Sequence, residues 1–126
     1  MTTHIREESY QVTATEDLSG AKYKAITLAG TIAQAADRAA RVGGIMRYAV
    51  NSGQNTGAIY DGITKAFVGG AVSTPGWPLM VANSGFLVAA TSGALTHARL
   101  AQASASSGDV AAVFAAFANP AFFTLA

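Results

Sequence analysis

The chain has 126 residues, which is enough for one domain with a hydrophobic core of its own. Hydrophobic residues make up 51% of it and charged residues 12%, about half the share of roughly 25% that is usual in soluble domains. The net charge of +1 excludes a strong field for nucleic acid or anionic membranes, and the absence of cysteine excludes disulfides, thiol catalysis and thiolate metal sites. So few charges predict a protein whose surface is covered by neighbours in an assembly.

Residues 1–16 are polar and mixed in sign, with isolated apolar residues at Ile5, Tyr10 and Val12. This pattern predicts an extended amino-terminal arm, either a frayed terminus or a segment that becomes ordered on a partner. The segment lacks the basic and then apolar pattern of a signal peptide, so we expect synthesis in the cytoplasm. Residues 17–126 are expected to form a single β domain with an apolar carboxyl-terminal tail.

The first half of this domain offers several short strands. Tyr23–Leu28 alternates between apolar and polar residues, which is typical of a strand. The alanine-rich segment 31–42 fits either a strand–turn–strand unit or a helix, although a helix face made of alanine buries little area. After Gly43 and Gly44, further strand candidates cover residues 45–50, 58–63 and 66–68.

Residues 66–98 contain no Asp, Glu, Lys or Arg and are interrupted by five glycines and two prolines. A membrane helix needs about 20 apolar residues in an unbroken run, so this stretch does not predict one. The tripeptide Asn-Ser-Gly at 83–85 separates two apolar runs, 79–81 and 86–88, and predicts a hairpin with glycine at the position that needs positive φ. Thr-Ser-Gly at 91–93 predicts a second turn of the same kind. Short strands at such spacing indicate a mainly β protein, a small barrel or sandwich with little helix.

The carboxyl end allows two structures. Apolar residues between 110 and 117 recur at helical spacing behind a possible cap, Asp109, which locally favours a helix. Read with a period of two, the same segment is apolar on both faces, as in a strand that is central or lies in a subunit interface. Pro120 ends the element in either case. Phe122 and Phe123 follow near the terminus, where we expect them to dock on another surface.

The chemistry-bearing residues predict neither an enzyme nor a cofactor or metal site. A catalytic arrangement needs a base, a nucleophile and an orienting group, and the chain offers only His4 and His97, without metal-ligand spacing. His97 is expected to pack at a strand edge rather than act as a base. Residues 53–57 lack the glycine spacing and the lysine of a phosphate loop. Trp77, held between Pro75-Gly76 and Pro78, is either an interface anchor or a cap on the core.

Seven phrases, taken in order, carry a family resemblance. They are Asp17-Leu18-Ser19, YKAITLAG (23–30), AARVGGIMRYAV (39–50), the turn 53–56, GAIYDGITKAFVGGAV (57–72), GWPLMVANSGFLVAATSG (76–93) and ALTHARLAQASASSGDVAAVFAAF (94–117). Together they resemble the small capsid decoration, or cement, proteins of tailed bacteriophages. Each phrase is a turn-and-strand pattern, and the order of the phrases gives the resemblance its weight.

The resemblance implies a β-barrel or tulip-like fold that assembles as a homotrimer on the outer surface of the virion's capsid. It implies an arm that pairs with strands of the major capsid protein and a role in stabilising the expanded shell against internal DNA pressure. It also implies that 110–117 is the last strand. Partners in the form of nucleic acid, membrane or a small-molecule substrate are not expected. A fibre or tail component of a phage is the alternative.

Two groups of residues are candidates for these contacts. The candidates in the capsid-binding arm are Ile5, Arg6, Tyr10 and Val12, and those at a subunit or capsid interface are Trp77, Pro78, Phe122 and Phe123.

Overall fold

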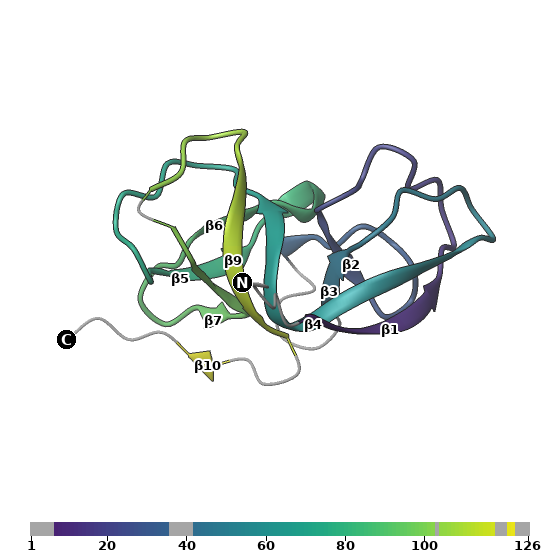
Figure 1. Cartoon of the computed structure of the whole chain (residues 1–126), viewed down its shortest axis with the longest axis horizontal. Coiled ribbons are helices and arrows are strands. Elements are labelled where there is room, and N and C mark those ends of the chain that lie inside the picture. Colours follow the sequence, from purple (N-terminus) through teal and green to yellow (C-terminus); the bar gives the residue numbers. More distant parts are fainter. Residues whose placement is uncertain (1–6, 36–41, 103, 118–120, 123–126) are drawn as a thin grey trace, which may run out of the picture.

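The computed structural model describes residues 7–35, 42–102, 104–117 and 121–122. Its strands are β1 (Glu7–Thr13), β2 (Ala25–Thr27), β3 (Val42–Met46), β4 (Asn55–Phe67), β5 (Pro78–Val81), β6 (Leu87–Ala89), β7 (Leu95–Thr96), β8 (Ala98–Leu100), β9 (Val110–Ala116) and β10 (Ala121–Phe122). The main sheet has the order β2-β3-β4-β9-β8-β5-β6, and β1 also pairs with β4. This sheet is barrel-shaped and nearly closed (Figure 1), which confirms the prediction of a mainly β fold. No helix in the described part is long and apolar enough to cross a membrane.

The strand β4 runs through both halves of the molecule (Figure 1). Its first half pairs with β1 and β3, and its second half pairs with β9. The sequence predicted two strands here, at 58–63 and 66–68, and this division is wrong. Thr64 turns inward and is buried, whereas Lys65 points outward and is exposed, so the polar residues between the two predicted strands keep the alternation of one continuous strand.

The core consists of two clusters. The larger includes Leu79, Leu87, Leu100 and Val113, and it extends from β5, β6, β8, β9 and the second half of β4 to residues of β2 and β3. The smaller cluster, which lies by β1, β2 and the first half of β4, contains Val12, Ala14, Leu18, Ala21, Ile26, Met46 and Ala58. Figure 1 shows two lobes, with β5, β6, β7 and β9 in one and β1, β2 and β3 in the other, and β4 runs through both.

The predicted hairpin at 83–85 is confirmed. A short 3-10 turn, η2 (Asn83–Gly85), joins β5 to β6. Gly85 has φ of +76°, and a Cβ there would lie 2.8 Å from the carbonyl oxygen of Ala25, so a side chain would have both strain and a clash. The Gly85 N–H donates to the carbonyl of Ala33 (2.8 Å), and Ala33 donates to Ala25 (2.9 Å). These bonds connect β2, the first strand in the order of the sheet, to the turn before β6, the last strand.

The strand β3 differs from its prediction. It begins at Val42 and includes both Gly43 and Gly44, whereas the sequence predicted a strand only after the glycines. Position 44 of this strand needs a glycine, because β4 passes so close that a Cβ would lie 2.5 Å from the carbonyl oxygen of Ile59. Of the ambiguous segment 31–42, Ile32 forms an isolated bridge with Ile26, and residues 36–41 lie outside the described residues.

The segment 110–116 is a strand, as the family resemblance implies and against the local helical spacing. Ala111, Val113 and Ala115 point inward and are buried, while Val110 and Phe114 point outward. Pairing with β4 on one side and β8 on the other satisfies its backbone, so tertiary contacts override the helical pattern.

Candidate docking surface

The outer face of the sheet carries a row of large side chains across three strands. Ile63 of β4 lies opposite Phe114 of β9, and Phe114 lies opposite Arg99 of β8. Ile63 is 37% and Phe114 41% exposed, and the Arg99 guanidinium lies 5.7 Å from the Phe114 ring centre. Exposed apolar side chains that gather in this way are typical of a contact surface.

A second group lies further along β4. The rings of Phe67 and Phe86 meet edge to face with their centres 6.0 Å apart. The Lys24 ammonium lies over both rings, 5.7 Å from the centre of Phe67 and 4.9 Å from that of Phe86. Such contacts hold a cation in place by the negative face of the ring without neutralising its charge.

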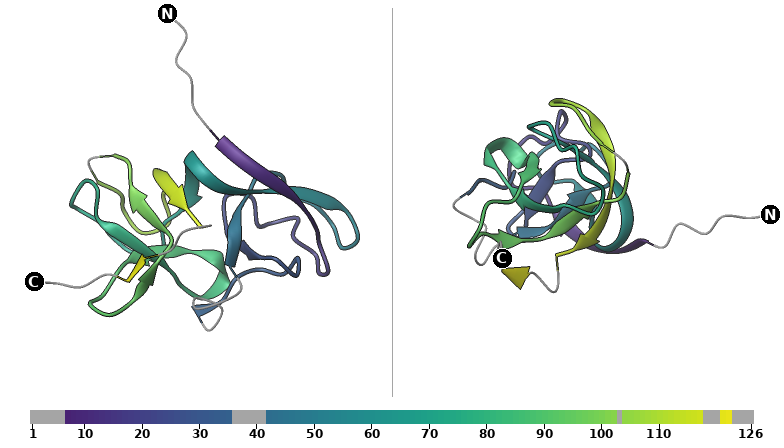
Figure 2. Two further views of the ribbon diagram at one scale, coloured as in Figure 1. Left: turned by 90° about the horizontal axis from the view of Figure 1, so that it is seen from below. Right: turned by 90° about the vertical axis from the view of Figure 1, so that its left-hand side faces the viewer.

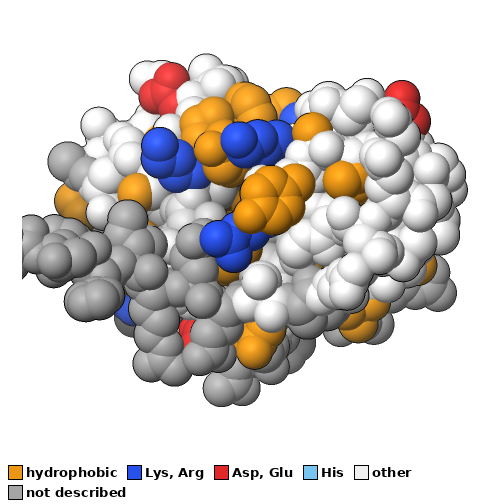
Figure 3. Space-filling model, turned by 45° about the vertical axis from the view of Figure 1, so that its right-hand side comes forward, with side chains coloured by type: hydrophobic (Ala, Val, Ile, Leu, Met, Phe, Trp, Pro, Cys, Tyr) orange, Lys and Arg blue, Asp and Glu red, His pale blue; other side chains and the backbone are white. Residues whose placement is uncertain are grey.

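The two groups form one surface, because Ile63, Lys65 and Phe67 alternate along β4 and point to the same side. We call this surface the basic–aromatic face. It consists of Lys24, Ile63, Lys65, Phe67, Phe86, Arg99, Val110 and Phe114. Figure 3 shows Lys and Arg side chains lying among large hydrophobic side chains on one side of the molecule, with Asp and Glu at the margins.

Three carboxylates of the described region accept from backbone N–H groups, whereas Asp61 lies in the groove that Ile63 and Arg99 also line. Glu16 accepts from Ile32 (2.8 Å), and Asp109 accepts from Ser106 (2.8 Å). Asp17 accepts from the backbone N–H of Ser19 (3.0 Å), and this bond lowers the pKa of the Asp17 carboxyl below its ordinary value. Among the side chains that the structure describes, no ion pair joins Lys24, Lys65 or Arg99 to a carboxylate.

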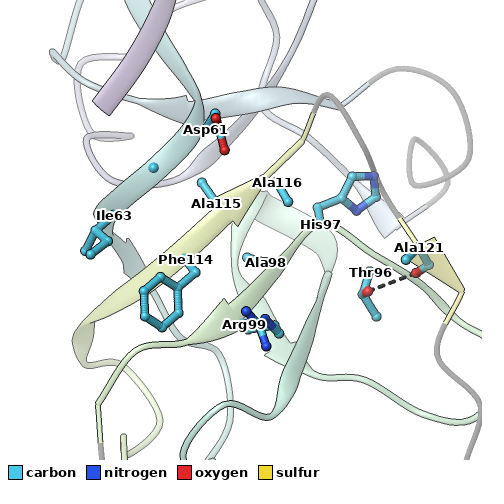
Figure 4. Close-up of a pocket in the computed structure, with 11 residues that line it drawn as sticks. Asp61, Ile63, Thr96, His97, Ala98, Arg99, Phe114, Ala115, Ala116 and Ala121 are labelled. Atoms are coloured by element: carbon cyan, nitrogen blue, oxygen red, sulfur yellow. Dashed lines mark hydrogen bonds between the residues drawn. The ribbon is translucent and has the colours of Figure 1, made fainter. Parts of the chain in front are cut away.

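A groove of about 400 Å³ borders this face (Figure 4). Ile63, Phe114 and Arg99 lie at one end of it, and His97 lies toward the other. His97 is 3% exposed and stacks on Phe117, with ring centres 5.4 Å apart, so it packs as the sequence predicted. Four alanines line the rest of the groove, together with Asp61, Gly62 and Thr96. Within the described residues there is no cluster of three or more metal-ligating side chains.

The structure gives the predicted arm residues different places. Ile5 and Arg6 lie outside the described residues. Tyr10 belongs to β1 and pairs with Ala58 of the same chain. Val12 is 6% exposed and belongs to the smaller core cluster, so it stabilises the fold instead of facing a partner. The segment predicted as an arm is therefore a strand of the chain's own sheet from Glu7 to Thr13 (Figure 2).

The predicted interface residues are also separated. Trp77 is half-buried against the larger core cluster, and its Nε1–H donates to the carbonyl of Ala90 (3.4 Å). Pro78 begins β5 and pairs with Arg99, so it borders the basic–aromatic face. Phe122 belongs to β10, which pairs with β7, and Phe123 lies outside the described residues.

The residues of the basic–aromatic face are not among the candidates predicted from the sequence. Period-two alternation in 110–116 was a signal for the outward position of Phe114. Its neighbours, however, come from strands far apart in the sequence, and only the pairing of β4, β9 and β8 brings them together.

In sequence comparisons, no protein-family profile and no curated protein matches this chain. Among solved structures, the fold is similar to that of the N base of head fiber gp8.5 in bacteriophage phi29. The TM-score is 0.60 with 13% sequence identity, and the match covers 89% of this chain and 96% of that one. At this identity the likeness establishes a shared fold.

Proposed function

We propose that this chain is a non-enzymatic structural protein of a tailed-phage particle, attached to the outer surface of the capsid. The observation that supports the proposal most is the fold shared with a phage head fiber base over 89% of the chain. The ordered phrases that resemble capsid decoration proteins point to the same class of protein by a separate route. The low content of charged residues fits a molecule with covered surfaces.

The proposal has two forms that differ in what the attached protein does. As a decoration protein, the chain binds the major capsid protein of the expanded shell and stabilises it against internal DNA pressure. A homotrimer would then hold three capsid subunits at once, so that modest contacts add up. As the base of a fibre, it anchors a further structure and need not stabilise the shell. The fold likeness favours the second form as much as the first.

Attachment to purified, expanded capsids that lack accessory proteins tests the proposal. We expect the chain to co-sediment with these capsids and to raise the temperature at which they release DNA or dissociate. Binding without a gain in heat stability supports the fibre-base form over the decoration form. Failure to bind contradicts both forms.

The same assay tests the amino-terminal segment. Deletion of residues 2–6 keeps all of the described strand β1, Glu7–Thr13, whereas a longer deletion removes residues of that strand. Weaker binding after this short deletion would support a capsid-binding role for Ile5 and Arg6. Unchanged binding would argue against that role.

A further inference from the structure

One edge of β4 is uncovered in the described part of the chain. Asp61 and Gly62 each pair with both β1 and β9, so these two strands lie on opposite edges of β4. The pairing with β9 continues to Phe67, whereas the described residues of β1, which begin at Glu7, pair with β4 only as far as Gly62. No described strand covers the edge of β4 next to Ile63 and Lys65.

The backbone direction at this edge follows from the hydrogen bonds around it. The Val68 N–H donates to Asp109, on the side of β9, whereas the Phe67 N–H donates to Tyr23, on the other side (3.0 Å). Since alternate residues of a strand direct their N–H and C=O groups to alternate edges, Ile63 and Lys65 direct theirs to the same side as Phe67. They offer a short template for another strand.

Two lysines lie beside this edge, and Asp61 lies at the end where β1 pairs with β4, in the groove that Ile63 also lines. Lys65 is exposed on the outer face, and the Lys24 ammonium lies over Phe67, where the edge meets Tyr23. Arg99 lies on the same face but two strands from this edge, on β8, over Phe114. A bound segment would therefore meet cations and aromatic rings.

We propose that an extended, acidic segment of a protein partner binds along this edge of β4 by strand addition, with its carboxylates on Lys65 and Lys24. The inference deepens the proposed function, because it names the contact through which the chain would attach to its particle. Backbone pairing would provide affinity, and alternate acidic side chains would provide specificity.

The observations favour a protein segment over nucleic acid. The net charge is +1, and the face presents only a few cations, whereas nucleic-acid binding depends on neutralising a run of phosphates. Backbone groups at a strand edge are matched by another peptide backbone. Ile63 and Phe114 add apolar contacts that a phosphate backbone would not use.

Synthetic peptides test the proposal on the full chain. The probe is a short peptide of alternating glutamate and valine, and its matched controls are a lysine–valine peptide and a glutamate–proline peptide that cannot form a ladder. We expect the glutamate–valine peptide to bind at least about tenfold more tightly than either control, with affinity that falls as salt rises. Backbone amide NMR shifts should change most at Ile63 and Lys65.

Charge-reversal variants identify the surface. Lys65→Glu should lower the affinity for the glutamate–valine peptide about tenfold. Arg47→Glu makes the same charge change at an exposed position in the other lobe, beside Tyr48, and should leave the affinity unchanged. Circular dichroism checks that both variants are folded.

Several results would overturn the inference. They are equal binding of the acidic and basic peptides, unchanged affinity of Lys65→Glu, tighter binding of a thymidine oligonucleotide than of the acidic peptide, or peptide binding only after deletion of residues 2–6. The last result would mean that the chain's own terminus occupies the edge.

Loss of capsid binding in Lys65→Glu but not in Arg47→Glu would support the inference. Failure of the unmutated chain to bind capsids while it binds the peptide would contradict the proposed function alone.

Discussion

Gly44 lies in β3 at a point where the backbone of β4 approaches closely. The space next to its Cα is filled by the backbone of Ala58 and Ile59, and the carbonyl oxygen of Ile59 is the nearest atom. Neither strand can move away easily, because β3 and β4 pair at Ile45 and Met46, which are fully buried. The glycine is required here by space and not by backbone conformation.

Gly44→Ala is therefore expected to lower the free energy of unfolding by about 2 kcal/mol, since the new methyl group overpacks a buried site. Gly20→Ala is the matched control, because a Cβ at Gly20 meets nothing within 4 Å, and its effect should stay within about 0.5 kcal/mol. Urea unfolding of both variants measures the difference. Equal effects would contradict the close approach of β3 and β4.

The strand β9 shows how a single element can carry both core and surface. Its inward residues pack in the larger core cluster, and its outward residues contribute to the basic–aromatic face. Val113 and Phe114 are neighbours in the sequence, yet Val113 is 0% and Phe114 41% exposed. In a helix at the observed spacing both side chains would lie on one buried face.

Truncation of these two neighbours tests the strand. Val113→Ala should lower the free energy of unfolding by about 2 kcal/mol, because it opens a cavity in the core. Phe114→Ala removes the larger side chain but should cost less than about 1 kcal/mol, since only cross-strand surface contacts are lost. Chemical denaturation gives both values. A larger loss for Phe114→Ala would favour the helical interpretation.

At the scale of the whole molecule, β4 links two core clusters. It contributes Ala58 to the smaller cluster and Ala66 to the larger. The only tryptophan of the chain, Trp77, packs against the larger cluster, whereas Val12 lies in the smaller one. Because one continuous strand carries both clusters, we expect the lobes to unfold together.

Val12→Ala is expected to lower the free energy of unfolding by about 2 kcal/mol. The loss should appear equally in Trp77 fluorescence, which reports on the other lobe, and in far-ultraviolet circular dichroism. Val110 is 39% exposed, so Val110→Ala should change the free energy of unfolding obtained from either signal by less than about 0.5 kcal/mol. If only the circular dichroism transition moved, the lobes would be independent.

The fold class and much of the turn chemistry could be predicted from local patterns of residues. Sparse charge, short apolar runs and the Asn-Ser-Gly turn at 83–85 indicated a small β-barrel, because these are local properties that a single segment expresses. The same local reasoning left the segment 110–117 open between helix and strand. It also divided β4 in two and assigned Val12 to an arm.

Which residues share a face depends on strand pairing, which is a tertiary interaction. Lys24, Phe67 and Phe86 meet although 43 and 19 positions separate them in turn, and Ile63, Phe114 and Arg99 meet through strand register. Strand pairing is a long-range interaction, and a shift of one residue in register would turn each side chain to the opposite face. The basic–aromatic face and the uncovered edge of β4 therefore follow from the pairing of the strands, which the sequence does not specify locally.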